Sequence, residues 1–328
     1  MLGAPAHRVW PLPDLPLRSQ RPPAPSGYAH LMIPSGTLRG IVAMLAACAA
    51  FGCMDALLKV LSGSFSPAQV AALRGLTSLP LVCLYVAWRR ETGALFARGL
   101  RWRLHLVRGL LTVAMLMLFT YGLRTLGLAE AYTLTFVAPL VITLLSVPLL
   151  GETVRARHWV AIAFGFIGVV VALRPESNAF LSLGSLAILA AAVCYALSNV
   201  LGRLVSRTEP SATLVFWTTV SLSLGGSLLA APQWTPLRLE HAWLLAGLAV
   251  SGFLGQLAIS EAFRHGQAAA IAPFEYSALA WAIALDWLIW RTVPDAWTLG
   301  GGAIIIASGL YLARHEAPRT RPTPQPVP

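Results

Sequence analysis

Ten long apolar segments divide this chain and limit what it can fold into. They cover about residues 38–61, 67–88, 104–123, 129–150, 157–174, 183–205, 211–231, 242–262, 268–290 and 296–313. A helix needs about 20 mostly apolar residues to cross the hydrocarbon core of a bilayer, and each segment comes close to that length. Only 11% of the residues are charged, against roughly 25% in soluble domains. We therefore predict an all-α integral membrane protein with ten transmembrane helices.

The basic residues indicate how these helices would be oriented. The formal net charge is +11, but the arginines are scattered between apolar segments and form no basic domain, which argues against nucleic acid as a partner. Loops on the side of the two termini carry 17 Lys and Arg residues, and loops on the opposite side carry 4. Cytoplasmic loops are the ones enriched in these residues. We expect a multi-pass protein of the cell inner membrane with both termini in the cytoplasm.

The two ends of the chain differ from the rest. Residues 1–35 and 317–328 are rich in proline and arginine, and the first of them has no apolar stretch as long as that of a signal peptide. We expect both ends to be disordered. Met32 stands just before the first apolar segment, so either Met1 or Met32 could start translation.

The sequence also repeats itself. A shift of 144 residues brings Asp55 onto Asn199 and Lys59 onto Arg203, and slightly smaller shifts align later segments. Each half, residues 36–175 and residues 183–316, holds five apolar segments, so the two halves must cross the membrane in opposite directions. We therefore predict two inverted five-helix repeats, a plan that recurs in secondary transporters.

Three stretches resemble the EamA family of the drug/metabolite transporter superfamily. They are MDALLKVLSGSFSPAQVAALRG (54–75), APLVITLLSVPLLGETVRARHWVAIAFGFIGVVVALRP (138–175) and APFEYSALAWAIALDWLIWRTVPDAWTLGGGAIIIASGLYLARHE (272–316). The resemblance implies transport of a small organic metabolite, for example an amino-acid derivative, S-adenosylmethionine or a riboflavin-like solute. The chain departs from the family pattern at Arg291, where a glutamate is common, and at Asp286, where a small residue is usual.

Three basic residues lie inside apolar segments, namely Lys59, Arg74 and Arg108. Lys59 is the only lysine and follows Asp55 by four residues, the favourable order for a helical ion pair. Arg74 lies as far beyond the intervening turn as Asp55 lies before it, so both should share one depth. We predict that Asp55 pairs with Lys59, can exchange to Arg74, and lines the substrate pathway with both. Two alternatives stay open: Lys59 extends to the lipid headgroups, and Asp55 with Arg74 only clamps two helices.

Five further residues are candidates for the substrate pathway. Glu130 and Glu275 are acids in later segments, and charged groups at depth usually face the bundle interior or a water-filled path. Asn199 is the repeat counterpart of Asp55, and Tyr276 and Trp281 lie deep enough to stack on a planar substrate. The alternatives are an interfacial acid for Glu130 and ordinary packing for the aromatic side chains.

Prolines and glycines predict local features of the helices. Pro139 lies inside its segment, where it would break or kink a helix. The small residues at 165–168 and 300–302 predict close packing between helices.

Two other classes of protein remain open. An integral membrane enzyme acting on a lipid-linked substrate would need acids or histidines clustered in its loops, whereas the seven histidines stand apart and most loops are short. A non-transporting membrane partner subunit would not need charges inside the membrane. The four cysteines stand singly in apolar segments, so we expect neither a disulfide nor a metal site from them. The histidines are isolated and no H-E-x-x-H or G-x-S-x-G motif occurs, so we expect no catalytic residue, and we expect no cofactor. The expected partners are a small-molecule substrate and the lipid bilayer, with no nucleic acid, and a homodimer is left open.

Overall fold

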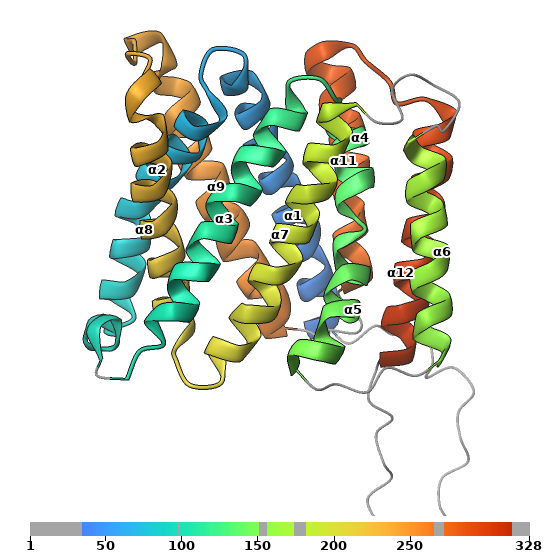
Figure 1. Cartoon of the computed structure of the whole chain (residues 1–328), viewed down its shortest axis with the longest axis horizontal. Helices are drawn as coiled ribbons and strands as arrows, with labels where there is room; N and C mark the ends of the chain where they lie inside the picture. Colours follow the sequence, from blue (N-terminus) through green and yellow to red (C-terminus); the bar gives the residue numbers. More distant parts are fainter. Residues whose placement is uncertain (1–34, 98, 151–155, 174–181, 266–271, 317–328) are drawn as a thin grey trace, which may run out of the picture. The chain divides into compact units, whose positions relative to one another are not determined.

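The structure, a computed structural model, describes residues 35–97, 99–150, 156–173, 182–265 and 272–316. The two ends that the sequence predicts to be disordered lie outside this part, apart from Ser35. Within it, every regular element is a helix or a helical turn (Figure 1). The longer helices are α1 (Ser35–Ser62), α2 (Pro67–Trp88), α3 (Trp102–Leu123), α4 (Leu128–Thr135), α5 (Ala138–Leu150), α6 (Ala156–Leu173), α7 (Leu183–Ser206), α8 (Ser211–Ala230), α9 (Ala242–His265), α11 (Ser277–Leu285) and α12 (Ala296–Glu316). Short 3₁₀ turns are η1 (Thr92–Phe96), η2 (Ala231–Gln233), η3 (Leu239–His241) and η4 (Ala272–Tyr276), and η5 (Asp286–Trp290) is a π-helical turn.

Seven helical stretches of the described residues are long and apolar enough to cross a membrane. They are Leu38–Ser62, Pro67–Trp88, Trp102–Leu123, Leu128–Leu149, Leu183–Ser206, Ser211–Gln233 and Leu239–Ala262. The apolar parts of α6 and α12 are shorter, Ile162–Ala172 and Ala296–Tyr311. These stretches confirm an all-helical membrane protein with several spans.

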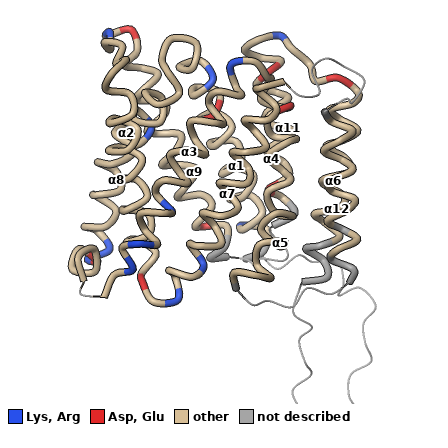
Figure 2. Tube along the Cα trace, in the orientation of Figure 1, with Lys and Arg blue, Asp and Glu red and all other residues tan. Residues whose placement is uncertain are grey.

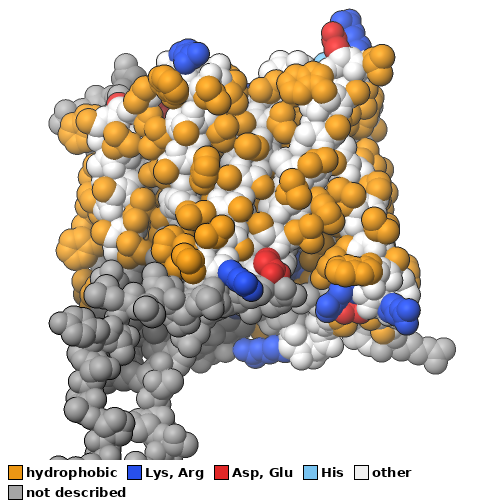
Figure 3. Space-filling model, turned by 180° about the vertical axis from the view of Figure 1, so that it is seen from behind, with side chains coloured by type: hydrophobic (Ala, Val, Ile, Leu, Met, Phe, Trp, Pro, Cys, Tyr) orange, Lys and Arg blue, Asp and Glu red, His pale blue; other side chains and the backbone are white. Residues whose placement is uncertain are grey.

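The surface of the helices fits a lipid environment. Figure 2 shows most charged residues at the ends of the helices and few between them. Figure 3 shows hydrophobic side chains spread over the sides of the helices; Leu84 is 65% exposed, Leu228 75% and Phe164 56%. Apolar surface of this extent would promote aggregation in water, whereas lipid tails solvate it.

The helices run between two ends, which we call the Ser35 end and the Ser62 end after the first and last residues of α1 (Figure 1). At the Ser62 end, Ser66 caps α2 by accepting a hydrogen bond from the backbone nitrogen of Gln69 at 3.2 Å, and Pro67 takes the first helical position. The Gln69 amide then exchanges two hydrogen bonds with the backbone of Thr235, at 2.7 and 2.9 Å. The start of α2 is thereby fastened to the connection that follows α8.

At the Ser35 end, Glu209 fastens the turn between α7 and α8 to the start of α3. Its Oε1 accepts a hydrogen bond from the backbone nitrogen of Arg101 at 3.0 Å, and its Oε2 lies 2.6 Å from Nε2 of His105. The His105 and Glu209 side chains are only 4% and 7% exposed. This buried contact holds α3 in place close to the arginine, Arg108, that follows one turn later.

Helices from the first half of the chain pack against helices from the second. α1 packs on α9, α2 on α8, α3 on α7, α4 on α11 and α6 on α12. Figure 1 shows α6 and α12 side by side, and likewise α2 and α8. Contacts between the halves, rather than within them, therefore build most of the bundle.

Two glycines let α2 and α8 approach backbone to backbone. A Cβ on Gly75 would lie 2.5 Å from the backbone nitrogen of Ser223, and a Cβ on Gly226 would lie 2.6 Å from that of Ala72. Only glycine fits at such distances. The two helices are therefore tightly joined in the halves nearer the Ser62 end.

Both local features expected from prolines and glycines are confirmed. α4 ends at Thr135 and α5 begins at Ala138, next to Pro139, which has no N–H to continue the helical ladder. Gly168 of α6 faces Gly301 of α12, and a Cβ on Gly168 would lie 2.9 Å from the Gly301 carbonyl oxygen. Gly168 and Gly301 thus serve close helix packing, whereas Gly300 has no neighbouring atom within reach of a Cβ.

Candidate functional site: a cationic cavity and a closed end

A cavity of about 400 Å³ lies between α1, α2, α3, α8 and α9. Most of the lining residues on α2, α3 and α8 come from the halves of these helices nearer the Ser35 end, including Tyr85, Arg108 and Ser211, and α9 contributes residues from its middle to Ser260. The cavity therefore extends from the middle of the bundle toward the Ser35 end. Its volume lies in the range typical of small-molecule sites.

The charged groups of this cavity are both cations. Arg74 from α2 and Arg108 from α3 line it, and no acid is among the described residues that do so. Apolar side chains such as Phe51 and Phe253 share the wall with hydroxyl groups. The residues with hydroxyl groups are Ser78, Tyr85, Thr112, Ser211, Thr218, Thr219 and Ser260.

Arg108 is held in place without being neutralised. Its Nε donates a hydrogen bond to the Ser198 carbonyl oxygen of α7 at 3.3 Å. Its guanidinium group packs on Gly202, where a Cβ would come within 3.2 Å of Nε. Its Nη1 is buried and has no hydrogen-bond partner in the described structure, and none of the ion pairs found there involves Arg108. Among the described residues, this cation is therefore positioned but has no acidic partner.

Asp55 is bound to Tyr132 of α4, whose hydroxyl group donates to Oδ2 of Asp55 at 2.6 Å. Arg74 lies near enough for its charge to act on both Asp55 and Tyr132. This proximity agrees with the depth expected from their equal spacing about the turn. The negative charge of Asp55 therefore offsets Arg74, in contrast to Arg108.

The predicted ion pair between Asp55 and Lys59 is wrong. Nζ of Lys59 instead lies 3.3 Å from Oδ1 of Asp286, and the two side chains are 14% and 3% exposed. Lys59 also lies over the Trp290 ring, 4.2 Å from its centroid. The reason is that Tyr132 already binds Asp55, whereas the buried carboxylate of Asp286 needs a cation. Lys59 is directed into the protein rather than away from it, which argues against the headgroup alternative.

Asp286 is the functional candidate that sequence reasoning missed. Its Oδ2 accepts a hydrogen bond from the backbone nitrogen of Ala129, in the first turn of α4, at 2.9 Å. It begins the π-helical turn η5, which is capped by the following residue, Arg291, with a φ of +56°; such turns are frequent at functional sites. The signal in the sequence for such an acid was Lys59, the only lysine, because a cation buried in the membrane requires an acidic partner.

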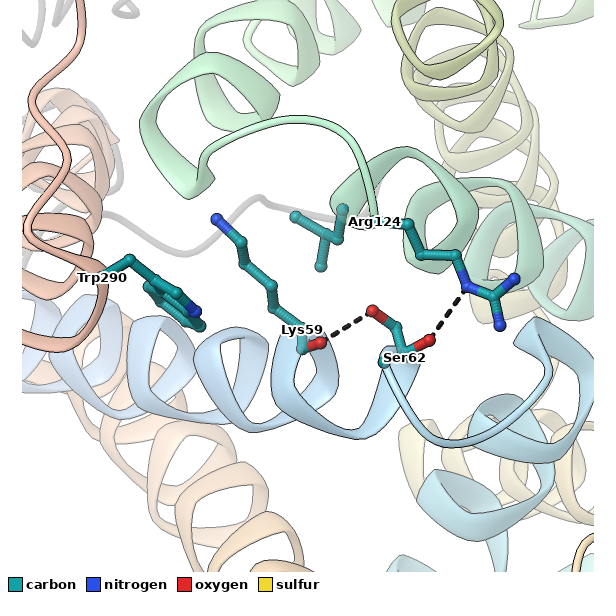
Figure 4. A pocket seen from close by; sticks show the side chains of 6 residues that line it. Lys59, Ser62, Arg124 and Trp290 are labelled. Atoms are coloured by element: carbon teal, nitrogen blue, oxygen red, sulfur yellow. Dashed lines mark hydrogen bonds between the residues drawn. The ribbon is translucent and has the colours of Figure 1, made fainter.

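A second pocket, of about 510 Å³, lies at the Ser62 end between Lys59, Arg124 and Trp290. Figure 4 shows Lys59 extending between Trp290 and Arg124, and Arg124 bound to the backbone at Ser62. Arg124 donates to the carbonyl oxygens of Ser62 at 2.9 Å and of Phe65 at 2.7 Å. The second pocket thus lies at the Ser62 end of the bundle, whereas the first extends from its middle toward the Ser35 end.

The other polar candidates fall in two places. Glu130 caps α4, because its Oε2 accepts a hydrogen bond from the backbone nitrogen of Gly127 at 3.2 Å. Asn199 donates to the Tyr195 carbonyl oxygen at 2.8 Å, and the charge of Glu275 acts on the Tyr195 side chain. Asn199 is therefore bonded within α7, and Glu275 lies near enough to Tyr195 for its charge to act there; sequence reasoning did not single out Tyr195.

The two aromatic candidates pack against helices. The Tyr276 ring lies 5.2 Å from that of Phe136, and its hydroxyl group abuts the backbone of Gly309. Trp281 is 41% exposed, and its Cβ packs on Gly52 of α1. Neither is among the described residues that line the two pockets.

Comparison with known proteins agrees with a helical membrane bundle. The family model described as EamA-like transporter family matches residues 38–174 and again residues 182–314. The chain belongs to the EamA-like transporter family. It is accordingly a multi-pass membrane transporter.

Named relatives of this EamA-like chain handle different solutes. A pseudopaline exporter of Pseudomonas aeruginosa is 27% identical over 285 residues, 86% of this chain and 97% of the exporter. An S-adenosylmethionine uptake transporter of Rickettsia conorii is 30% identical over 65% of this chain and 72% of its own. A riboflavin transporter of Vibrio cholerae is 27% identical over 87% of this chain and 96% of the transporter. A solved crystal structure, described only as that of a protein, has a TM-score of 0.58 at 21% identity and covers 87% of this chain and 99% of that one, which supports the fold alone.

Proposed function

We propose that this EamA-like protein is an inner-membrane secondary transporter of a small organic metabolite, which it moves by alternating access between two inverted five-helix repeats, residues 36–175 and 183–316. The observation that carries the proposal is the presence of two pockets in the same bundle, one at the Ser62 end lined by Lys59 and Arg124, and one extending toward the Ser35 end lined by Arg74 and Arg108. The solute classes considered are amino-acid derivatives, S-adenosylmethionine and riboflavin-like molecules. The names of the relatives support transport of small organic solutes in general.

Ten spans follow if α6, α12 and the segment formed by η4, α11 and η5 are added to the seven long stretches. The packing of the helices supports the inverted repeat. In the repeat, α1, α2, α3, α4 and α6 of the first half correspond to α7, α8, α9, α11 and α12 of the second. The contact between α1 and α9 therefore corresponds to the contact between α7 and α3, and each of the pairs α2–α8, α4–α11 and α6–α12 joins two corresponding helices. A two-fold pseudo-axis between the halves would produce this pattern.

The arginine distribution assigns the Ser35 end to the cytoplasm. The structure then corresponds to a cytoplasm-facing state. The cavity extends toward the Ser35 end, whereas α2 and α8 are in close contact in their halves nearer the Ser62 end. At the Ser62 end, Asp286 of the second half is bound to Lys59 and Ala129 of the first half. Opening this end requires that these contacts break, so they form the outer gate.

The proposed pathway residues have separate roles. Asp55 and Arg74 act at the end of the cavity that lies in the middle of the bundle. Lys59 acts at the outer gate, and Asn199 and Glu275 act beside Tyr195. Glu130, Tyr276 and Trp281 act indirectly, by positioning the helices that they hold.

Flux into liposomes tests the transport proposal. Purified protein is reconstituted and the uptake of labelled S-adenosylmethionine, riboflavin and amino-acid derivatives is followed, with protein-free liposomes as the control. Saturable uptake of at least one solute is expected. Hydrolysis or group transfer without flux would instead favour the enzyme alternative.

Cysteine labelling tests the orientation. Gly93 in η1 has open space around it, so a Gly93→Cys variant, in a background without the four native cysteines, tolerates the change. An impermeant reagent should label it only after the cells are opened. Labelling from outside intact cells would overturn the assignment.

A further inference from the structure

We propose that the cavity between α1, α2, α3, α8 and α9 selects solutes that carry one carboxylate, and that Arg108 binds this group. The inference rests on the proposed transport function and deepens it by naming the class of substrate. It depends on three features of the cavity: the sign of its charge, the unmatched hydrogen-bonding capacity of Arg108, and the mixed character of the remaining wall.

The charge of the cavity favours an anion. Arg74 and Arg108 are the charged residues among its described lining. Asp55 lies near enough to Arg74 for its negative charge to counter that of Arg74, so about one net positive charge remains, on Arg108. A cation enclosed by helices without a counter-charge is unfavourable, and a bound anion would remove that cost.

Arg108 has the geometry of an anchor rather than of a structural clamp. Arg124, at the other end of the bundle, uses its guanidinium group to bind two carbonyl oxygens. Arg108 uses only Nε in this way, toward Ser198, and its Nη1 is left without an acceptor. Thr112 supports the arrangement, because its hydroxyl group lies 3.3 Å from that of Ser198. A carboxylate in the cavity can accept two parallel N–H bonds from a guanidinium group, and it would supply the missing acceptor once the Arg108 side chain turns its buried Nη1 toward the cavity.

The single remaining charge distinguishes a carboxylate from a phosphate ester. A phosphate monoester carries about −1.5 to −2 charges at pH 7, more than the cavity offsets. Hydroxyl groups such as those of Ser78 and Thr218 and apolar rings such as Phe51 and Phe253 form the rest of the wall. These groups suit a substrate with an amphipathic body.

Equilibrium binding tests the proposal separately from flux. The purified full chain is placed in phosphatidylcholine nanodiscs, which contain no anionic lipid to compete, and titrated calorimetrically. The probes are N-acetyl-phenylalanine, its uncharged amide and phenyl phosphate. We expect the carboxylate to bind at least about tenfold more tightly than the amide, since charged hydrogen bonds contribute to this extent, and more tightly than the phosphate.

Variants on α3 connect this preference to Arg108. Arg108→Gln should abolish the difference between acid and amide, and Arg108→Lys should retain part of it because the charge remains. Arg103→Gln is the matched control, since it makes the same charge change at an exposed site of the same helix, and it should retain the full preference.

Three outcomes would overturn the inference. They are equal binding of acid and amide by the unaltered protein, tighter binding of phenyl phosphate than of the carboxylate, and equal losses in Arg108→Gln and Arg103→Gln. The first two need no variant, so a folding defect cannot obscure them. Flux of neutral or cationic solutes without binding of the carboxylate would leave transport standing and refute the inference, whereas carboxylate binding without any flux would do the reverse.

Discussion

Charged side chains at the Ser62 end and in the cavity differ in how they are satisfied. At the Ser62 end, Lys59 has Asp286, Asp286 also has the Ala129 amide, and Arg124 has two carbonyl oxygens. In the cavity, Arg108 has one carbonyl oxygen and an unpaired nitrogen. Unpaired polar groups away from water are costly. A transporter must empty and refill its site, so a group that is satisfied only by the solute is suited to that site, and groups satisfied by the protein are suited to closing it.

The comparison predicts different consequences of substitution in the two regions. Removing a charge at the Ser62 end should destabilise the closed arrangement, because a buried partner is stranded. Removing a charge in the cavity should change which solutes bind and leave the fold largely intact.

The largest effect is expected from Asp286→Leu. It strands the Lys59 ammonium group, which is only 14% exposed, and leaves the Ala129 amide without its acceptor. Breaking a buried pair in this way costs about 3 kcal/mol. The free energy of unfolding, measured by titration with a denaturing detergent in mixed micelles, should fall by this amount.

Two controls make that prediction specific. Adding Lys59→Met to Asp286→Leu should recover most of the loss, because no charge is then stranded. Glu240→Leu removes one partner of the exposed Arg238–Glu240 pair, which should cost at most about 1 kcal/mol. Equal losses for Asp286→Leu and Glu240→Leu would contradict a special role for the buried pair.

The next effect is expected from Gly226→Leu, which tests how the cavity is closed toward the Ser62 end. The added side chain would force α8 away from the α2 backbone at Ala72, at a cost of about 1–3 kcal/mol. Cysteine labelling of cavity residues from the Ser62 end should increase at the same time. Gly300→Leu is the control, because a Cβ there meets no neighbouring atom. Comparable destabilisation by both variants would show that the close approach is unimportant.

The positions of the long helices could be predicted from sequence, because they depend on local properties. The segment predicted at 67–88 coincides with α2, and the break beside Pro139 follows from a missing N–H. The proximity of Asp55 and Arg74 was also accessible, since a short turn between antiparallel helices relates depth to distance along the chain.

The partner of Lys59 could not be predicted in this way. Asp286 lies 227 residues away, so their contact depends on how the two halves pack, and the π-helical turn that presents Asp286 has no clear sequence signal. Arg108 is recognisable from sequence as an intramembrane cation. Its unmatched nitrogen, however, depends on α7, and the sequence alone does not reveal which cations find partners.

Asp55→Asn sharpens the comparison inside the cavity. Asparagine can still accept the Tyr132 hydrogen bond, but it no longer offsets the charge of Arg74. The carboxylate probe should therefore bind about tenfold more tightly, the equivalent of about 1.4 kcal/mol, and flux should slow because release is weakened. Tyr132→Phe keeps the charge and removes the hydrogen bond, so its affinity for the probe should be nearly unaltered. An unchanged affinity in Asp55→Asn would show that Arg74 does not contribute to anion binding.

The smallest effect separates the two aromatic candidates from the cavity wall. Phe253 lines the cavity, whereas Trp281 is 41% exposed and packs on α1. Phe253→Ala should weaken binding of the N-acetyl-phenylalanine probe about fivefold through lost apolar contact, the equivalent of about 1 kcal/mol. Trp281→Ala should leave the affinity within about twofold. Calorimetric titration of both variants in the same nanodiscs makes the comparison, and a larger loss for Trp281→Ala than for Phe253→Ala would mean that the solute binds against α11 and that the cationic cavity is not its main site.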